Sequence, residues 1–320
     1  EVDGIMVVFV PQAIMPPYDV AAAVGRAAES NSKPVVCSIS GGGGIRAAAR
    51  ALHAHSVPHY LTPARAALGL GVLCRYGRIQ ARDAVEVSLP QGVDLERARY
   101  LVETATARQR VLDPHVGSEL AAAYGISPPP SGLAETADEA VALAKGMGYP
   151  VALKWVAPGV VHKADVGGVA LGLEDEQAVR DAYAGIVKGG GALVQRMAPP
   201  GLEVVVGAQR DLQFGPLVMF GLGGAYVEVL RDVVFRLAPV SDSEAREMVA
   251  ETAAGRILAG VRGEPPKDID AVVEVIRRVA QLMIDLPQVA EVDLNPLIVG
   301  SADEGAWAVD VRIVLESEGE

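Results

Sequence analysis

Apolar runs and helical patterns alternate in the first third of the chain. Three apolar segments, at 4–10, 34–39 and 58–61, are typical of strands buried on both faces of a sheet. Helical periodicity follows each of them, over 17–28, 45–54 and 63–76. This alternation predicts a small α/β unit with a parallel, doubly wound sheet over residues 1–90, with a linker at about 77–94.

The pattern changes after residue 95. Helices are predicted at 95–110, 114–124 and 136–147, and a strand at 150–156. Short strands between Gly and Pro turns then suggest antiparallel pairing, at 192–197, 202–207, 216–220 and 233–236. Helices at 243–253 and 269–286 and strands at 289–299 and 306–314 complete a predicted α+β half.

Composition narrows the class of protein. The 320 residues suggest about two domains, with a core built mainly from aliphatic side chains, because only 4% of residues are aromatic. The net charge of −12 argues against a broad surface for nucleic acid or anionic lipid. Two cysteines, no signal peptide and no long apolar run predict a cytoplasmic protein with no membrane association. The start at Glu1 suggests a fragment of a longer polypeptide.

The stretch KWVAPGVVHKADVGGV, residues 154–169, carries the most chemistry. A strand delivers Lys154, and a loop bounded by glycines presents His162, Lys163 and Asp165. The chain uses 22 Arg but only six Lys, and lysine suits a site that needs a compact charge on phosphate. A histidine on such a loop can act as a mobile nucleophile. The alternative is a turn residue that is hydrogen-bonded to Asp165.

Two further glycine-rich turns are candidate phosphate sites. Gly221 to Gly224 could cover phosphates, although the chain contains neither a Walker loop nor a Rossmann fingerprint. By themselves, these glycines favour a tight hairpin. Gly41 to Gly44 precede a predicted helix and suit either anion binding or a plain turn.

A third constellation lies near the C-terminus. Glu291, Asp293 and Asn295 share one face of a predicted strand, and Asp310 follows on a neighbouring strand. Carboxylate and amide oxygens suit Mg²⁺ that is held partly by nucleotide phosphates. A solvated face at the sheet edge is the alternative.

Taken together, these residues resemble a known family. From about residue 95 onward the chain is similar to the ATP-grasp domain of the ADP-forming (NDP-forming) acyl-CoA synthetases, relatives of succinyl-CoA synthetase. The resemblance rests on four stretches, LAAAYGISPP (120–129), 148–173, 193–240 and EVDLNPLIV (291–299). It implies an α/β chain with a flavodoxin-like, CoA-ligase-type domain at 1–90 and a two-lobed α+β ATP-grasp domain at 91–320. The lobes would span about 95–195 and 196–320.

The resemblance also implies roles for particular residues. His162 would be the phosphorylated nucleophile, and Asp293 would help to orient a phosphohistidine. Asn295 and Asp310 would hold Mg²⁺. The expected ATP- or ADP-binding residues are Lys154, Lys163, Gln195, Arg196, Met197, Glu203, Gly223 and Gly224.

The implied reaction is acyl-CoA + ADP + Pi to carboxylic acid + CoA + ATP, with CoA as a substrate. The expected partners are small-molecule substrates, without nucleic acid or membrane, in an oligomer. The upstream CoA-binding and phosphohistidine domains of fused family members are missing from this sequence. The alternative is a non-catalytic nucleotide-sensing module of a protein acetyltransferase fusion.

Overall fold

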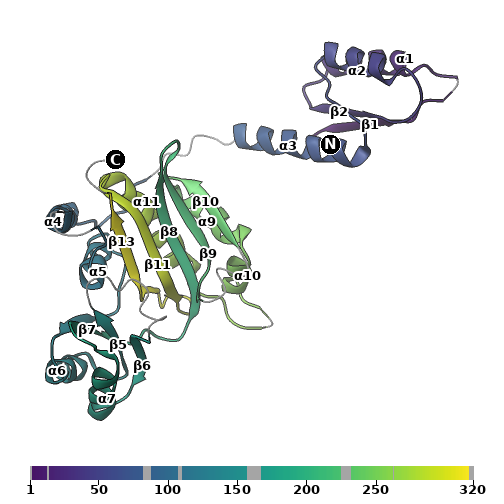
Figure 1. Ribbon diagram of the computed structural model, residues 1–320. Helices are drawn as coiled ribbons and strands as arrows, with labels where there is room; N and C mark the ends of the chain where they lie inside the picture. Colours follow the sequence, from purple (N-terminus) through teal and green to yellow (C-terminus); the bar gives the residue numbers. More distant parts are fainter. Residues whose placement is uncertain are drawn as a thin grey trace. The chain divides into compact units, whose positions relative to one another are not determined.

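Figure 1 shows the ribbon of the computed structural model. Its buried side chains form separate cores. The structure describes residues 2–12, 14–81, 88–106, 110–156, 167–224, 232–261 and 263–316. Two units are distinguished, Glu1–Val85 and Glu86–Glu320. The α/β class expected from the sequence is confirmed.

The first unit is a parallel sheet between helices. Strands β1 (Ile5–Phe9), β2 (Val35–Ile39) and β3 (His59–Tyr60) pair in the order β1-β2-β3. Helices α1 (Pro17–Glu29) and α2 (Ile45–Ala54) pack together on one face, and α3 (Pro63–Gln80) covers the other (Figure 1). Helix α3 continues past the predicted end at 76 because residues 77–80 contain no proline to stop it.

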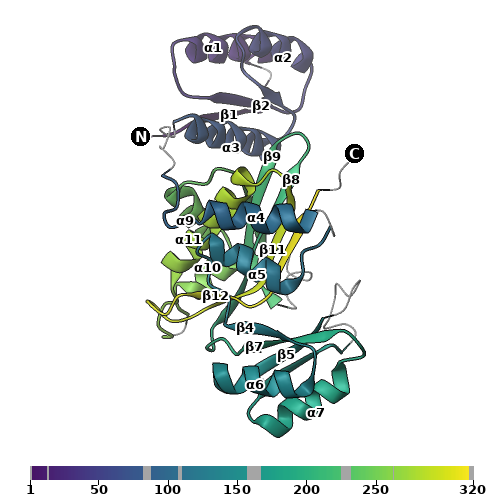
Figure 2. The same cartoon turned by 90° about the vertical axis from the view of Figure 1, so that its left-hand side faces the viewer.

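The second unit contains a small lobe around a four-stranded antiparallel sheet. Its order is β4-β7-β5-β6, with strands β4 (Ser131–Ala134), β7 (Gly191–Arg196), β5 (Val151–Val156) and β6 (Val169–Leu173). Helices α6 (Ala137–Met147) and α7 (Glu176–Ile186) lie side by side on one face (Figure 2). The sequence patterns did not predict β4, β6 or α7.

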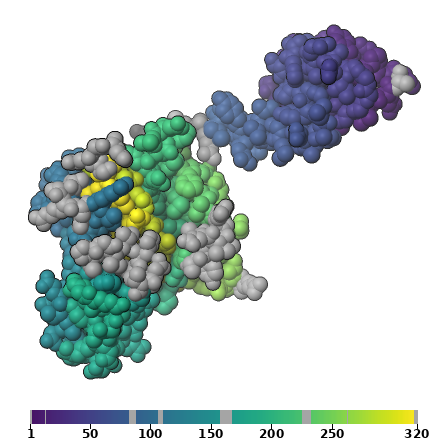
Figure 3. Space-filling model, viewed as in Figure 1, coloured from purple at the N-terminus to yellow at the C-terminus, as the bar shows by residue number. Residues whose placement is uncertain are grey.

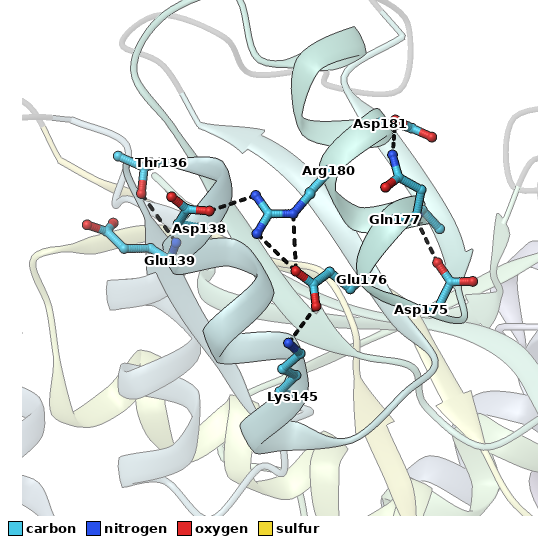
Figure 4. Close-up of polar contacts among 10 residues, drawn as sticks. Thr136, Asp138, Glu139, Lys145, Asp175, Glu176, Gln177, Arg180 and Asp181 are labelled. Atoms are coloured by element: carbon cyan, nitrogen blue, oxygen red, sulfur yellow. Dashed lines mark hydrogen bonds and ion pairs between the residues drawn. The ribbon is translucent and has the colours of Figure 1, made fainter.

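Surface ion pairs connect these two helices (Figure 4). Arg180 on α7 binds Asp138 on α6 at 2.6 Å and Glu176 on its own helix at 3.0 Å. Lys145 on α6 reaches Glu176 at 2.5 Å. The side chains are largely exposed, so the buried contacts beneath them, such as Val179, contribute more to holding the lobe together.

The large lobe of the second unit is built on a sheet of order β10-β9-β8-β11-β12, with β13 paired to β11. The strands are β8 (Leu202–Asp211), β9 (Gly215–Leu222), β10 (Val233–Leu237), β11 (Val289–Val299), β12 (Ala306–Ala308) and β13 (Val311–Leu315). Helices α9 (Asp242–Glu251), α10 (Ala253–Leu258) and α11 (Ile269–Asp285) pack against one face of this sheet.

Two features of this lobe differ from the sequence analysis. Helices α4 (Leu95–Thr106) and α5 (Pro114–Ala123) were expected in the first lobe, but their buried side chains join the core of the large lobe. The segment expected as one strand at 306–314 is two strands that both pair with β11. The break between them falls at Val309 and Asp310, which places the Asp310 side chain in an exposed position instead of inside a continuous ladder.

Figure 3 shows the surface of the second unit, with the small lobe in teal and the large lobe in green and yellow. None of the helices that the structure describes is long and apolar enough to cross a membrane.

Candidate nucleotide site

The Lys154 side chain links the two lobes of the second unit. It extends from β5, is only 6% exposed, and its Nζ donates a hydrogen bond to the Val309 carbonyl oxygen at 2.8 Å. Burial lowers the pKa of Lys154, and the nearby Asp310 carboxylate opposes this shift. Within the described part of the chain, Lys154 forms no ion pair. A buried ammonium group with one carbonyl partner is suited to receive an anion.

Gln195 lies on the same face of the small-lobe sheet as Lys154. In the antiparallel register, Lys154 is opposite Leu193 and Ala152 is opposite Gln195. The opposite face of these strands carries Leu153 and Val194, which pack in the core with α6 and α7. Gln195 is 1% exposed, and its Nε2 has no hydrogen-bond partner among the described residues. Such an unsatisfied buried amide is typical of a ligand site.

Arg196 ends strand β7 and Met197 follows it, but both are placed differently from Gln195. The Arg196 N–H donates to the Pro130 carbonyl at 2.9 Å and the Met197 N–H to the Pro150 carbonyl at 3.1 Å, so both donors are already used. Arg196 is exposed and, with Met197 and Trp307, lines a proline-rich pocket of about 370 Å³. Strand alternation therefore directs the Arg196 side chain away from the face that bears Lys154 and Gln195.

Asn295 brings three backbone segments of the large lobe together. Its N–H donates to the Asp310 carbonyl at 3.2 Å, and its Oδ1 accepts a hydrogen bond from the Gly224 N–H at 3.3 Å. The Val309 N–H donates to the Pro296 carbonyl at 3.1 Å. Asn295, Asp310 and the carbonyl that binds Lys154 are consequently neighbours.

The turn after β9 allows the backbone to approach closely. A Cβ on Gly223 would come within 2.6 Å of the Val204 carbonyl group, and the Gly223 N–H donates to the Glu203 carbonyl at 3.0 Å. Gly224 has a φ of +70°, and a Cβ there would collide with the Glu203 carboxylate. The exposed Glu203 side chain is thus beside this turn, as expected for residues that surround one ligand.

Asp293 lies two residues before Asn295 and lines a recess of about 270 Å³ with Glu291, Met219 and Phe235. Burial, and then repulsion from Glu291, raises the pKa of Asp293 to about 6, although Arg312 opposes the shift. Arg312 is opposite Asp293 in the β11–β13 register and forms an ion pair with Glu291 at 2.7 Å. Arg312 was not among the residues expected from the sequence.

The oxygen atoms near Asn295 suit Mg²⁺ only in part. Asn295 and Asp310 supply an amide and a carboxylate, which are hard donors of the kind this cation prefers. In the described ranges, no group of three or more His, Cys, Asp or Glu side chains is arranged to hold a metal. The geometry therefore fits a cation that takes its remaining ligands from phosphates and water.

The expected nucleophile cannot be placed. His162, Lys163 and Asp165 lie at 157–166, outside the described residues. The other expected residues come from β5, β7, β8, the turn after β9, β11 and the β12–β13 connection. The Val309 carbonyl, which the sequence could not mark, joins them. Together these groups can neutralise and orient a polyphosphate between two sheets.

Comparisons with known proteins identify the class. The model of the ATP-grasp domain family matches residues 103–315. Acetate–CoA ligase [ADP-forming] I of Archaeoglobus fulgidus is 42% identical over 304 residues, which cover 92% of this chain and 44% of that protein. The beta subunit of acetate–CoA ligase [ADP-forming] I of Pyrococcus furiosus is 41% identical over 229 residues, covering 68% of this chain and 98% of the subunit.

A solved structure supports the same class of protein. The dinucleotide-forming acetyl-coenzyme A synthetase 1 of Ca. Korarchaeum cryptofilum, in complex with coenzyme A and Mg-AMPPCP, matches 68% of this chain and all of its own. The TM-score is 0.63 at 42% identity, and its phosphohistidine segment points towards the nucleotide binding site. The chain belongs to the ATP-grasp family, among the ADP-forming acetate–CoA ligases. The family resemblance stated from the sequence is confirmed, and the alternative of a sensing module is not favoured.

Proposed function

We propose that this chain binds ATP or ADP with Mg²⁺ and carries the phosphoryl-transfer step of an ADP-forming acyl-CoA ligase. The observation that supports this most directly is the meeting of Lys154, Asn295 and the Asp310 segment at one place between the lobes. The chain spans 44% of the A. fulgidus ligase but 98% of the P. furiosus beta subunit. The complete ligase reaction, with CoA and an acyl group, therefore involves polypeptide beyond this part.

In this proposal, the chain's own residues hold the nucleotide. Lys154 donates to phosphate oxygens in place of the Val309 carbonyl, and Gln195 uses its free amide on the same sheet face. Glu203 binds the ribose, and Gly223 and Gly224 leave room for phosphates. Because the Arg196 side chain points to the other sheet face, Arg196 and Met197 line the adenine through their main chain. Lys163 binds the phosphates.

Asn295 and Asp310 would hold the cation. Mg²⁺, when bound, neutralises phosphate charge and orients the terminal group. The nucleophile is His162: an imidazole nitrogen forms a bond to the γ-phosphorus as the bond to the β-phosphate oxygen breaks, and ADP leaves. Asp293 positions the phosphorylated imidazole. In the reverse direction, the phosphoryl group returns to ADP and yields ATP.

The rest of the proposal concerns the whole ligase. The phosphoryl group would be exchanged with acyl-CoA and phosphate at CoA-binding and phosphohistidine domains outside these residues. The name of the P. furiosus relative describes a beta subunit, which supports an oligomeric assembly for this chain as well. The acyl group would be bound mainly by those other domains.

Labelling with γ-labelled ATP and Mg²⁺ tests the transfer step. We expect an acid-labile label on the protein that is lost in His162→Ala and is discharged to ATP when ADP is added. His115→Ala, which changes a partly exposed histidine on α5 paired with Glu119, is the matched control and should label normally. A label that persists in His162→Ala would disprove the assigned nucleophile.

A further inference from the structure

Helix α3 carries apolar side chains on the face that points away from its own sheet. Leu68 is 72% exposed, Val72 67% and Ile79 54%. At about 100° per residue, positions four and seven apart fall on one stripe of a helix. We call this stripe, with the small residues beside it, the outer α3 face.

The opposite side of the same helix packs against the rest of the first unit. Ala66 is fully buried, and a Cβ on Gly4 of the strand segment would meet Leu70 and Cys74. Gly69 lies against the Tyr60 ring. The apolar character of the outer α3 face is therefore not explained by packing in the first unit.

The outer α3 face is hollowed. Small residues open a groove of about 610 Å³ along it, lined by Ala64, Ala67, Leu68, Gly71, Val72 and Arg75. Gly71 has no atoms within 4 Å of the position that a Cβ would take. A shallow groove between larger apolar ridges is the shape that receives the side-chain ridge of another helix.

Charge indicates the kind of helix. Residues 63–80 contain Arg65, Arg75 and Arg78 and no acidic residue, whereas the whole chain has a net charge of −12. None of these three guanidinium groups forms an ion pair with the rest of the described chain. Three arginines that have no ion-pair partner among the described residues thus border the apolar stripe.

We propose that the outer α3 face is a docking site for an amphipathic helix with an apolar stripe and acidic flanks. Such a helix would bury Leu68, Val72 and Ile79 and place carboxylates beside Arg75 and Arg78. The A. fulgidus ligase contains more than half of its length outside the aligned part, so ligases of this family have further polypeptide that can supply this helix. The inference does not depend on the phosphoryl-transfer proposal.

Two other occupants fit less well. A second copy of α3 would place arginines against arginines, because this helix has no acidic residue to pair with them. A membrane surface would not need the groove at Gly71, since lipid packs on a convex apolar ridge as readily as on a hollow one.

Binding of designed peptides to the 320-residue chain tests the proposal. The probe is a dye-labelled helical peptide with a leucine stripe and glutamate flanks, compared with the same peptide carrying lysine flanks. Fluorescence anisotropy should show at least tenfold tighter binding of the glutamate peptide, weakened by added salt. The double variant Arg75→Glu, Arg78→Glu should reverse this preference, so that the lysine peptide binds more tightly than the glutamate peptide.

Substitutions on the outer α3 face complete the test. Leu68→Lys with Val72→Lys should weaken binding of the glutamate peptide at least tenfold, with unchanged circular dichroism because both side chains are exposed. Leu212→Lys, at a fully exposed leucine of the β8–β9 turn, is the matched control and should bind normally. Three outcomes would each overturn the proposal. Both peptides could bind equally well, or the chain could form a dimer that Val72→Lys abolishes. The chain could also bind phosphatidylserine vesicles in preference to the peptide.

Discussion

Lys154 and Val309 come from different lobes and are joined by a 2.8 Å hydrogen bond from the ammonium group to the main-chain carbonyl. Val309 directly precedes Asp310, whose own carbonyl accepts the Asn295 N–H at 3.2 Å. Lys154 is the one buried lysine of the described residues. The hydrogen bond therefore holds its ammonium group beside the turn at Val309 and Asp310. A phosphate group that binds here would lie beside both the Lys154 ammonium group and the residues proposed to hold the cation.

Replacing this lysine should separate binding from folding. Lys154→Met approximately preserves the length of the side chain but removes a positive charge that burial disfavours. The melting temperature should therefore stay the same or rise. The ATP dissociation constant should increase at least tenfold, about 1.4 kcal/mol, when measured by calorimetry. Lys188→Met, at an exposed lysine of the small lobe, should change neither quantity. Unaltered ATP affinity in Lys154→Met would remove Lys154 from the site.

The cation requirement should depend on Asp310. Asp310→Asn preserves shape but removes the only carboxylate of the expected pair, so the gain in ATP affinity produced by Mg²⁺ should fall at least tenfold. Affinity measured in excess chelator should change little. Asp303→Asn is a suitable control, because it alters an exposed turn residue with a φ of +67° that asparagine also adopts. A normal Mg²⁺ effect in Asp310→Asn would contradict the assignment.

The turn after β9 should not accept a side chain. Gly223→Ala places a methyl group within 2.6 Å of the Val204 carbonyl, where only backbone movement relieves the contact. We expect a loss of about 2–3 kcal/mol in unfolding free energy, measured with denaturant. Gly185→Ala is the matched control: it lies in α7 with open space at the Cβ position, and should stabilise the protein by about 0.5–1 kcal/mol. Equal stability of the two variants would contradict the close approach at Gly223.

The strongly periodic parts of the fold could be predicted from the sequence. Helix α2 was predicted with the observed bounds, Ile45–Ala54, and the apolar strands of the first unit were placed within one or two residues. Strand β6 was missed because Val169–Leu173 contains a glycine and fully buries none of its side chains. Helix α7 was missed although Asp175 caps it and its apolar residues Val179, Tyr183 and Ile186 recur at helical spacing.

The site was harder to predict because its groups come from distant segments. Motif spacing singled out Lys154, Asn295 and Asp310, but nothing in the sequence could mark the Val309 carbonyl, which is a backbone atom. Strand alternation could have separated Gln195 from Arg196, since neighbours on a strand point to opposite faces. Arg312 became visible only when the β11–β13 register placed it opposite Asp293.

Asp293 should make stability depend on pH. Burial and the Glu291 carboxylate raise its pKa from the ordinary 3.8 to about 6, while Arg312 acts in the opposite direction and Asp310 adds a small repulsion. The folded state therefore binds more protons than the unfolded state between these values. The resulting stabilisation is full below pH 3.8 and is lost as the pH rises through about 6.

The variant Asp293→Asn removes this ionisation. Because the buried carboxylate is charged in the folded wild type at pH 7.5, the variant should be more stable there by roughly 1–3 kcal/mol, at about 1.4 kcal/mol per unit of pKa. The advantage should shrink steadily toward pH 4, as followed by urea denaturation across that range. Glu291→Gln is the informative comparison, since it breaks the 2.7 Å ion pair with Arg312 and frees that guanidinium for Asp293. The pH dependence should then weaken, because Asp293 gains a cationic partner. If the unfolding free energy of Asp293→Asn differed from that of the wild type by the same amount at every pH, the raised pKa of Asp293 would be contradicted.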